Sequence, residues 1–90
     1  MRKIVLVVTS HCPRCEYVRR TVFEKIAEAC PGHTYSVNGS FANWFVQKYG
    51  IKGAPAILFL DGEEKKGLAY KEMDVDKIIR WIREGKYNND

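Results

Sequence analysis

Two cysteines separated by two residues are the strongest chemical signal in this chain of 90 residues. The segment Cys12-Pro13-Arg14-Cys15 follows a short apolar run and opens a stretch with helical spacing of apolar residues. Two intervening residues at the start of a helix bring two sulfur atoms within reach of a disulfide bond. A cysteine pair in this position, between a strand and a helix, is typical of thiol–disulfide exchange.

The two cysteines are expected to differ in reactivity. A thiolate at Cys12 would face the positive end of the helix dipole and could accept an N–H bond from Arg14 or Cys15. Pro13 has no N–H to offer and fits the first helical position, and the Arg14 side chain adds a cation. We therefore predict that the pKa of the Cys12 thiol lies well below its ordinary value. Cys15, one turn into the helix, is expected to be less exposed.

This difference predicts a mechanism in which Cys12 and Cys15 are the catalytic residues. Cys12 attacks a substrate disulfide and forms a mixed disulfide, and Cys15 then attacks Cys12 and releases the reduced product. The chain is thus predicted to be an enzyme that needs no cofactor beyond the cysteine pair. His11 could stabilise the thiolate or relay a proton, or it could be an exposed loop residue. Arg14 could tune the local charge or be simply solvated.

The elements around the motif predict an α/β structure. The β-branched run 4–8 suits a strand buried on both faces, and a helix follows the cysteines until Pro31-Gly32 ends it. The apolar face predicted for this helix consists of Val18, Val22, Ile26 and Ala29. Residues 33–37 read as a short second strand.

The second half of the chain continues the alternation. Ser40 is the predicted N-cap of a helix that ends before Gly50, and residues 56–60 form a second apolar strand. Asp61-Gly62 marks a hairpin, and residues 67–71 are the weak return strand. The last helix is expected to begin after Asp74 and to end at Gly85. The tryptophans on the predicted helices, Trp44 and Trp81, are expected to pack in the core or at its edge.

The predicted order is β-α-β-α-β-β-α. A helix between two parallel strands implies a right-handed crossover, and the hairpin adds an antiparallel edge. We predict an α/β fold with a mixed four-stranded sheet and helices on both faces. Residues 1–85 are expected to form a single domain, because this length fits one core, and residues 86–90 are expected to be a frayed tail.

Composition and charge argue against several other classes of protein. Hydrophobic residues make up 46% of the chain, as in a packed domain, and the net charge of +4 includes no block of like charges, so nucleic-acid binding is not expected. The apolar run 4–8 is too short for a signal peptide or a membrane span. We therefore expect a cytoplasmic protein that is a monomer and has no membrane partner.

The sequence resembles the thioredoxin superfamily, in particular the small thioredoxin-like and glutaredoxin-like proteins of microbes. The resemblance covers nearly the whole chain and rests on residues 10–15, on residues 49–55 and on the strand and turn that follow. In this family a proline that matches Pro55 is cis and lies beside the cysteine pair, and the backbone at Ala54 pairs with an extended substrate segment. The resemblance thus implies substrate binding by Ala54 and Pro55. Without it, Pro55 would read as a strand-entry proline.

Departures from the family pattern narrow the expected function. Pro13 directly after the first cysteine is glutaredoxin-like, and His11 stands where thioredoxins usually have tryptophan. Leu6 occupies the place of a buried acid that thioredoxins use as a proton acceptor. Residues 67–70 lack the glycine pair with which glutaredoxins hold glutathione. We therefore expect protein disulfides rather than glutathione as substrates, and an upstream thiol or flavin-dependent reductase as partner.

Metal binding is the main alternative, because zinc sites also use two cysteines at this spacing. Four zinc ligands could come from Cys12, Cys15, His11 and either Cys30 or His33, if the fold brings them together. An iron–sulfur cluster held by Cys12 of two chains is a related hypothesis. A module that keeps the fold without catalysis is a third. Cys30 is otherwise expected to pack as a small hydrophobic residue, with a regulatory thiol as the alternative.

Overall fold

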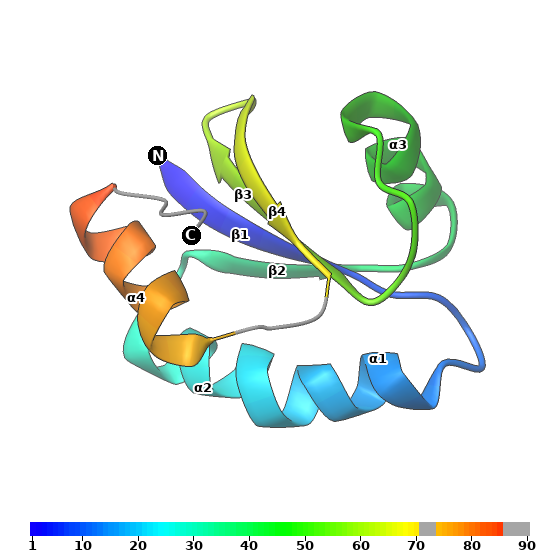
Figure 1. Cartoon of the computed structure of the whole chain (residues 1–90), viewed down its shortest axis with the longest axis horizontal. Coiled ribbons are helices and arrows are strands. Elements are labelled where there is room, and N and C mark those ends of the chain that lie inside the picture. The colour runs from blue at the N-terminus through cyan, green and yellow to red at the C-terminus, as the bar shows by residue number, and fades with distance from the viewer. Residues whose placement is uncertain (71–73, 86–90) are drawn as a thin grey trace.

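The computed structural model describes residues 1–70 and 74–85, which form a four-stranded mixed sheet (Figure 1). The strands are β1 (Arg2–Val7), β2 (Thr34–Val37), β3 (Ala56–Asp61) and β4 (Glu64–Ala69). Their spatial order is β2-β1-β3-β4, with β1 parallel to β2 and the other two pairings antiparallel. The predicted mixed sheet is confirmed. Antiparallel pairing is more extensive than the hairpin alone suggested, because β3 also runs antiparallel to β1.

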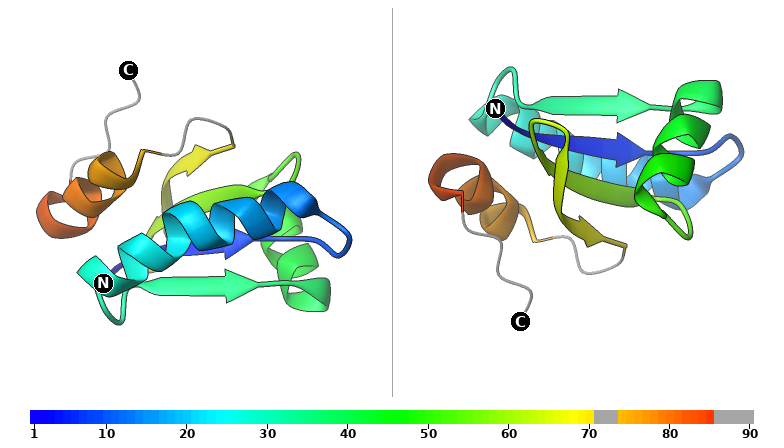
Figure 2. Two further views of the ribbon diagram at one scale, coloured as in Figure 1. Left: turned by 90° about the horizontal axis from the view of Figure 1, so that it is seen from below. Right: turned by 90° about the horizontal axis from the view of Figure 1, so that it is seen from above.

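The helices cover both faces of this sheet, as predicted. They are α1 (Pro13–Val18), the π-helical segment η1 (Arg19–Phe23), α2 (Glu24–Ala29), α3 (Gly39–Tyr49) and α4 (Val75–Glu84). Figure 1 and Figure 2 show α1, η1 and α2 as one continuous run on the same side of the sheet as α4, and α3 crossing the other side near one end of the strands. No helix among the described residues is long and apolar enough to cross a membrane.

The central strand β1 supplies side chains to two separate cores. Because successive side chains of a strand point to opposite faces, Ile4 and Leu6 pack with α2 and α4, and Val5 and Val7 pack with α3. None of these four side chains is more than 2% exposed. Coverage on both faces explains why the run is continuously apolar rather than alternating.

A wide turn in η1 changes which residues of the first helical run reach the core. The N–H of Glu24 donates to the carbonyl of Arg19, five residues earlier, which is the π-helical pattern. The buried residues are Cys15, Val18, Phe23, Ile26 and Cys30. The prediction was therefore wrong for Ala29, which is exposed, and Val22 is only partly buried. The wide turn advances the core face by one residue, so that Phe23 and Cys30 take these two places.

The ends of the later elements agree only in part with the sequence. Asn38, not Ser40, precedes α3, because the Asn38 carbonyl already accepts a helical bond from Ala42 N–H at 3.2 Å. Gly50 ends α3 with a positive φ of 67°, as predicted. The return strand β4 begins at Glu64, earlier than predicted. The predicted strand end at residue 71 and the predicted tail 86–90 lie outside the described residues.

The last helix is capped at both ends. The Asp74 carboxylate accepts hydrogen bonds from the N–H groups of Asp76 and Lys77 at 2.9 and 3.3 Å, which confirms the predicted N-cap. At the other end, the Arg2 guanidinium donates to the carbonyls of Ile82 and Arg83 at 3.0 and 3.2 Å. Arg2 therefore ties the first strand to the last turn of α4.

We expect Gly85→Ala to lower the free energy of unfolding by about 1–2 kcal/mol. Gly85 has a φ of 75°, and a Cβ atom there would lie 2.5 Å from a guanidinium nitrogen of Arg2. The destabilisation has two sources, which are the strain of an alanine at a positive φ and its contact with Arg2. Urea unfolding of Gly85→Ala, Arg2→Ala and the double variant separates these two contributions. Strict additivity of the two single changes would contradict a contribution from that contact.

Candidate redox-active site

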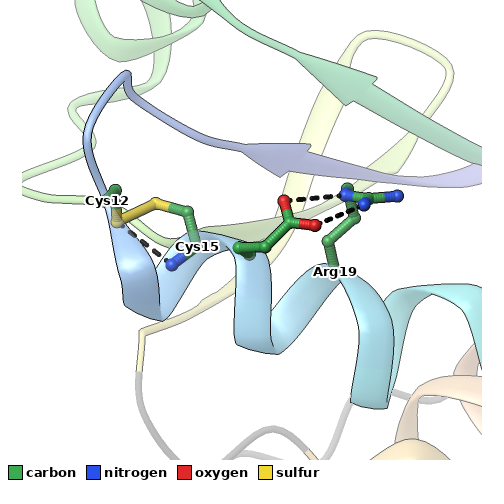
Figure 3. The surroundings of a disulfide bond; sticks show 4 residues. Cys12, Cys15 and Arg19 are labelled. Atoms are coloured by element: carbon green, nitrogen blue, oxygen red, sulfur yellow. Dashed lines mark hydrogen bonds and ion pairs between the residues drawn. A yellow bond between two sulfur atoms is a disulfide. The ribbon is translucent and has the colours of Figure 1, made fainter.

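Cys12 and Cys15 are joined by a disulfide bond at the start of α1 (Figure 3). Their Cα atoms are 5.2 Å apart, and Cys12 is the N-cap residue of the helix with Pro13 directly after it. The pair lies in the connection from β1 to α1, so the central strand and the longest helical run together hold it. The expected proximity of the two sulfur atoms is confirmed.

The two sulfur atoms have different surroundings. Cys15 is buried, with 3% of its surface exposed, whereas Cys12 is only half-buried. The backbone N–H of Cys15 donates to the Sγ atom of Cys12 at 3.1 Å. The expected lower exposure of Cys15 is confirmed, and a backbone donor points at Cys12, where the sequence analysis placed one.

A cavity of about 540 Å³ adjoins the disulfide. It is lined by Val8, Thr9, His11, Cys12, Pro13, Cys15, Glu16 and Arg19. His11 is exposed, has a left-handed φ of 54° and belongs to the same cavity as both cysteines. This position agrees with both alternatives for His11, a role at the Cys12 thiolate and an exposed loop residue.

The charges on this side of the disulfide neutralise one another. The Nε atom of Arg19 donates to Glu16 at 3.2 Å, a second contact joins Arg19 to Glu24 at 3.2 Å, and Arg20 lies 3.6 Å from Glu16. Figure 3 shows Arg19 one turn along the helical run from Cys15. The hydrogen bonds from Arg19, followed by the positive charges of Arg19 and Arg20, hold the pKa of the Glu16 carboxyl below its ordinary value.

This ion pair predicts a stability that depends on pH. The pKa of Glu16 is lower in the folded than in the unfolded chain. The contribution of the Glu16 carboxylate to the free energy of unfolding is therefore complete at pH values above its pKa in the unfolded chain. It is lost as the pH falls through the pKa in the folded chain. We expect Glu16→Gln to be less stable than the native protein near neutral pH. The difference between their free energies of unfolding should shrink as pH falls, as measured by urea unfolding at several pH values. The matched control is Glu28→Gln, an exposed glutamate of α2 outside these ion pairs. An equal acid dependence in both variants would contradict the assignment.

A second cavity, of about 430 Å³, lies on another side of the cysteine motif. It is lined by Arg14, Lys52, Gly53, Ala54, Pro55 and Tyr70. The Ala54–Pro55 peptide bond is cis, and Pro55 is buried. The fold therefore brings the loop before β3, with its cis proline, next to Arg14 of the cysteine motif.

Comparison with known proteins identifies the architecture. No protein-family model and no curated protein matches the sequence. A mutant thioredoxin from Halobacterium salinarum superimposes with a TM-score of 0.75 at 17% identity, over 99% of this chain and 77% of that one. Thioredoxin 1 from Thermosipho africanus gives 0.70 at 15% identity over 90% of each chain. The reduced thioredoxin of Schistosoma mansoni gives 0.70 at 17% identity, over 91% of this chain and 76% of that one.

The chain has the thioredoxin fold. At these identities the likeness concerns the architecture alone, so the chemistry of the site is argued from its own residues. Within this thioredoxin fold, Leu6 is fully buried in the core beside the helices, and no polar or charged side chain among the described residues is buried. The described interior therefore contains no buried acid that could accept the proton of Cys15.

The thioredoxin fold places two of the proposed metal ligands, Cys30 and His33, away from the cysteine pair, whereas His11 lines the same cavity as the pair. Cys30 is buried in the core at the end of α2, and the Nδ1 atom of His33 lies 2.8 Å from the Arg2 carbonyl oxygen. Within residues 1–70 and 74–85, no group of three or more histidine, cysteine or acidic residues is gathered as a metal site would require. Cys30 packs as the small hydrophobic side chain that the sequence analysis expected.

Among the residues that line the two cavities, sequence reasoning missed three charged residues and one tyrosine. Glu16 and Arg19 are three residues apart on the predicted helix, a spacing that brings side chains together, so this pair could have been found. Lys52 lies within the motif that precedes Pro55 and could also have been considered. Tyr70 had no local signal, because it reaches the site through the pairing of β4 with β3 and a hydrogen bond from the Lys52 N–H, both distant in sequence.

Proposed function

We propose that this protein is a thiol–disulfide oxidoreductase that reduces protein disulfides through Cys12 and Cys15. The observation that carries the proposal is the bonded cysteine pair at a helix start, with one sulfur accessible and the other buried. A half-buried Cys12 beside an open cavity can meet a substrate disulfide, whereas a buried Cys15 can meet only Cys12. The thioredoxin fold supports this reading at the level of architecture.

The proposed reaction transfers two electrons in two exchange steps. The Cys12 thiolate attacks one sulfur of the substrate disulfide, a bond forms between them, and the second substrate sulfur leaves as a thiolate that takes a proton from solvent. Cys15 then loses its proton and attacks the Sγ atom of Cys12. The disulfide of Cys12 and Cys15 closes, and the first substrate sulfur leaves as a thiolate. An external thiol or flavin-dependent reductase returns the pair to the dithiol.

The residues around the pair have assigned roles in this proposal. The Cys15 N–H and the helix start stabilise the thiolate of Cys12, and Arg14 adds a positive charge. The cavity that Cys15 and His11 both line gives the Cys15 proton a route to solvent. The backbone at Ala54, beside Pro55, pairs with an extended segment of the substrate protein.

A redox titration in dithiothreitol buffers tests the proposed function. Free thiols are trapped at each potential and counted by mass. We expect one transition in which the protein gains or loses two hydrogens, at about −220 to −280 mV. A much less negative potential would make the protein an oxidant or isomerase rather than a reductase. Thiols that stay blocked until a chelator is added would identify a metal site and contradict the proposal.

A further inference from the structure

The two sides of the cysteine motif differ in their balance of charge. In the cavity next to the disulfide, Arg19 is paired with Glu16 and Glu24. The second cavity is lined by two exposed cations, Arg14 and Lys52, and by no acidic residue of the described chain. Neither cation forms an ion pair within residues 1–70 and 74–85. Among the described residues, the charges that line this second cavity are therefore the ones that favour an anion.

The walls of this cavity are suited to hold a side chain as well as a charge. The backbone N–H of Lys52 donates to the Tyr70 hydroxyl oxygen at 2.9 Å, which ties the loop before β3 to the segment after β4. Ala54, Pro55 and Tyr70 line the same cavity as the two cations and supply apolar surface to it. A short carboxylate side chain could place its stem on the apolar surface and its oxygens toward Arg14 and Lys52.

We propose that the cavity formed by Arg14, Lys52, Ala54, Pro55 and Tyr70 binds an aspartate or glutamate next to the target cysteine of a protein substrate. The preferred substrates are thus disulfides in extended, acidic segments. This inference rests on the proposed function, because it names the substrate class of the same site. An extended segment that pairs with the Ala54 backbone spans about 3.3 Å per residue, so residues close to the target cysteine lie within the cavity.

Charge complementarity should act on the rate of encounter and on the lifetime of the complex. Opposite charges speed association and fix the register of the two partners, and the effect weakens as salt screens it. A preference of about fivefold to tenfold for acidic over neutral segments is expected at low ionic strength. The preference should shrink at high salt, because both cations are exposed.

The test uses symmetric peptide disulfides, in which two copies of one short peptide are joined through a single cysteine. Three peptides differ only in the residues that flank the cysteine, which are acidic, amide or basic. The dithiol protein is mixed with each disulfide, the reaction is quenched with acid, and products are counted by mass. The measured quantity is the ratio of rate constants between peptides for one protein, so a change in the intrinsic reactivity of Cys12 cancels.

Lys52→Glu is the main variant, because Lys52 is remote in sequence from the cysteines. We expect it to remove the acidic preference and to favour the basic peptide. Arg14→Glu should shift the ratio in the same direction. The matched control is Lys66→Glu, which makes the same charge change at a lysine of β4 that is paired with Glu64 at 3.1 Å. It should leave the ratio within about twofold of the native protein.

Three results would overturn the inference. Equal rates for the three peptides with the native protein would leave the proposed function intact and refute the acidic preference. An equal effect of Lys66→Glu and Lys52→Glu would show that net charge, not this cavity, sets the preference. If the native protein reduces glutathione disulfide faster than the acidic peptide, and Lys52→Glu lowers the rate with glutathione disulfide, the cavity would be assigned to glutathione. Failure to reduce any disulfide would refute the proposed function itself.

Discussion

Replacing Cys12 by serine is expected to eliminate disulfide reduction. A serine hydroxyl cannot form the mixed disulfide and does not provide a thiolate, so both exchange steps are lost. The loss should bring the rate of peptide-disulfide reduction down to that of the uncatalysed reaction. The measurement is turnover with dithiothreitol as reductant, because this reagent regenerates the dithiol of the native protein without a protein partner.

Cys15→Ser should behave differently, because it retains the attacking sulfur. The variant is expected to stop after the first exchange and to accumulate a mixed disulfide, visible as a mass increase of one peptide per protein chain. Cys30→Ala is the matched control, since Cys30 is also a cysteine but is buried in the core. It should keep turnover near the native level. A mixed disulfide trapped on Cys12→Ser instead would reverse the assigned roles of the two cysteines.

Trp81→Ala is expected to have the largest effect on stability. Trp81 is 2% exposed, and its ring lies 5.2 Å from that of Phe59 in the core between the sheet and α4. Removing a buried aromatic side chain of this size costs about 3–5 kcal/mol through lost burial and the cavity that remains. Small domains have total stabilities of about 5–15 kcal/mol, so the variant should unfold at a much lower urea concentration.

The second tryptophan provides the control for this experiment. Trp44 is 52% exposed on α3, where Lys48 lies 4.8 Å from its ring centre. The same change to alanine there removes mostly exposed surface, so we expect an effect below about 1 kcal/mol. Urea unfolding followed by far-ultraviolet circular dichroism compares the two variants without relying on tryptophan fluorescence. Similar losses of unfolding free energy in the two variants would contradict the prediction, which depends on the different burial of the two side chains.

The features that the sequence predicts well are those with local causes. The apolar run before Cys12 predicts a doubly covered strand, and Asp74 predicts the start of the last helix. The cysteine motif and the segment before Pro55 are short motifs, and their residue types alone indicate the role that they are predicted to have. In each case the information that makes the prediction lies within a few neighbouring residues.

Features that depend on distant contacts could not be predicted in the same way. Val22 and Phe23 are both apolar, so helical spacing alone cannot show that a π-helical turn places Phe23 in the core. The antiparallel direction of β3 relative to β1 depends on the path of the chain around α3. Tyr70 reaches the site through the pairing of β4 with β3 and a hydrogen bond from the Lys52 N–H, 18 residues earlier in the chain.

The burial of Cys15 has a consequence for the kinetics of the proposed reaction. Because only Cys12 of the pair is accessible, an oxidised substrate and the reductase that restores the dithiol must approach the same sulfur. They cannot occupy the protein together, and one product must leave before the next reactant enters. Steady-state rates should therefore follow a ping-pong pattern, with parallel lines in double-reciprocal plots. The oxidised substrate reacts with the dithiol form of the protein, and the reductase reacts with the disulfide form. At high concentration each reactant should inhibit turnover by binding to the form with which the other reacts.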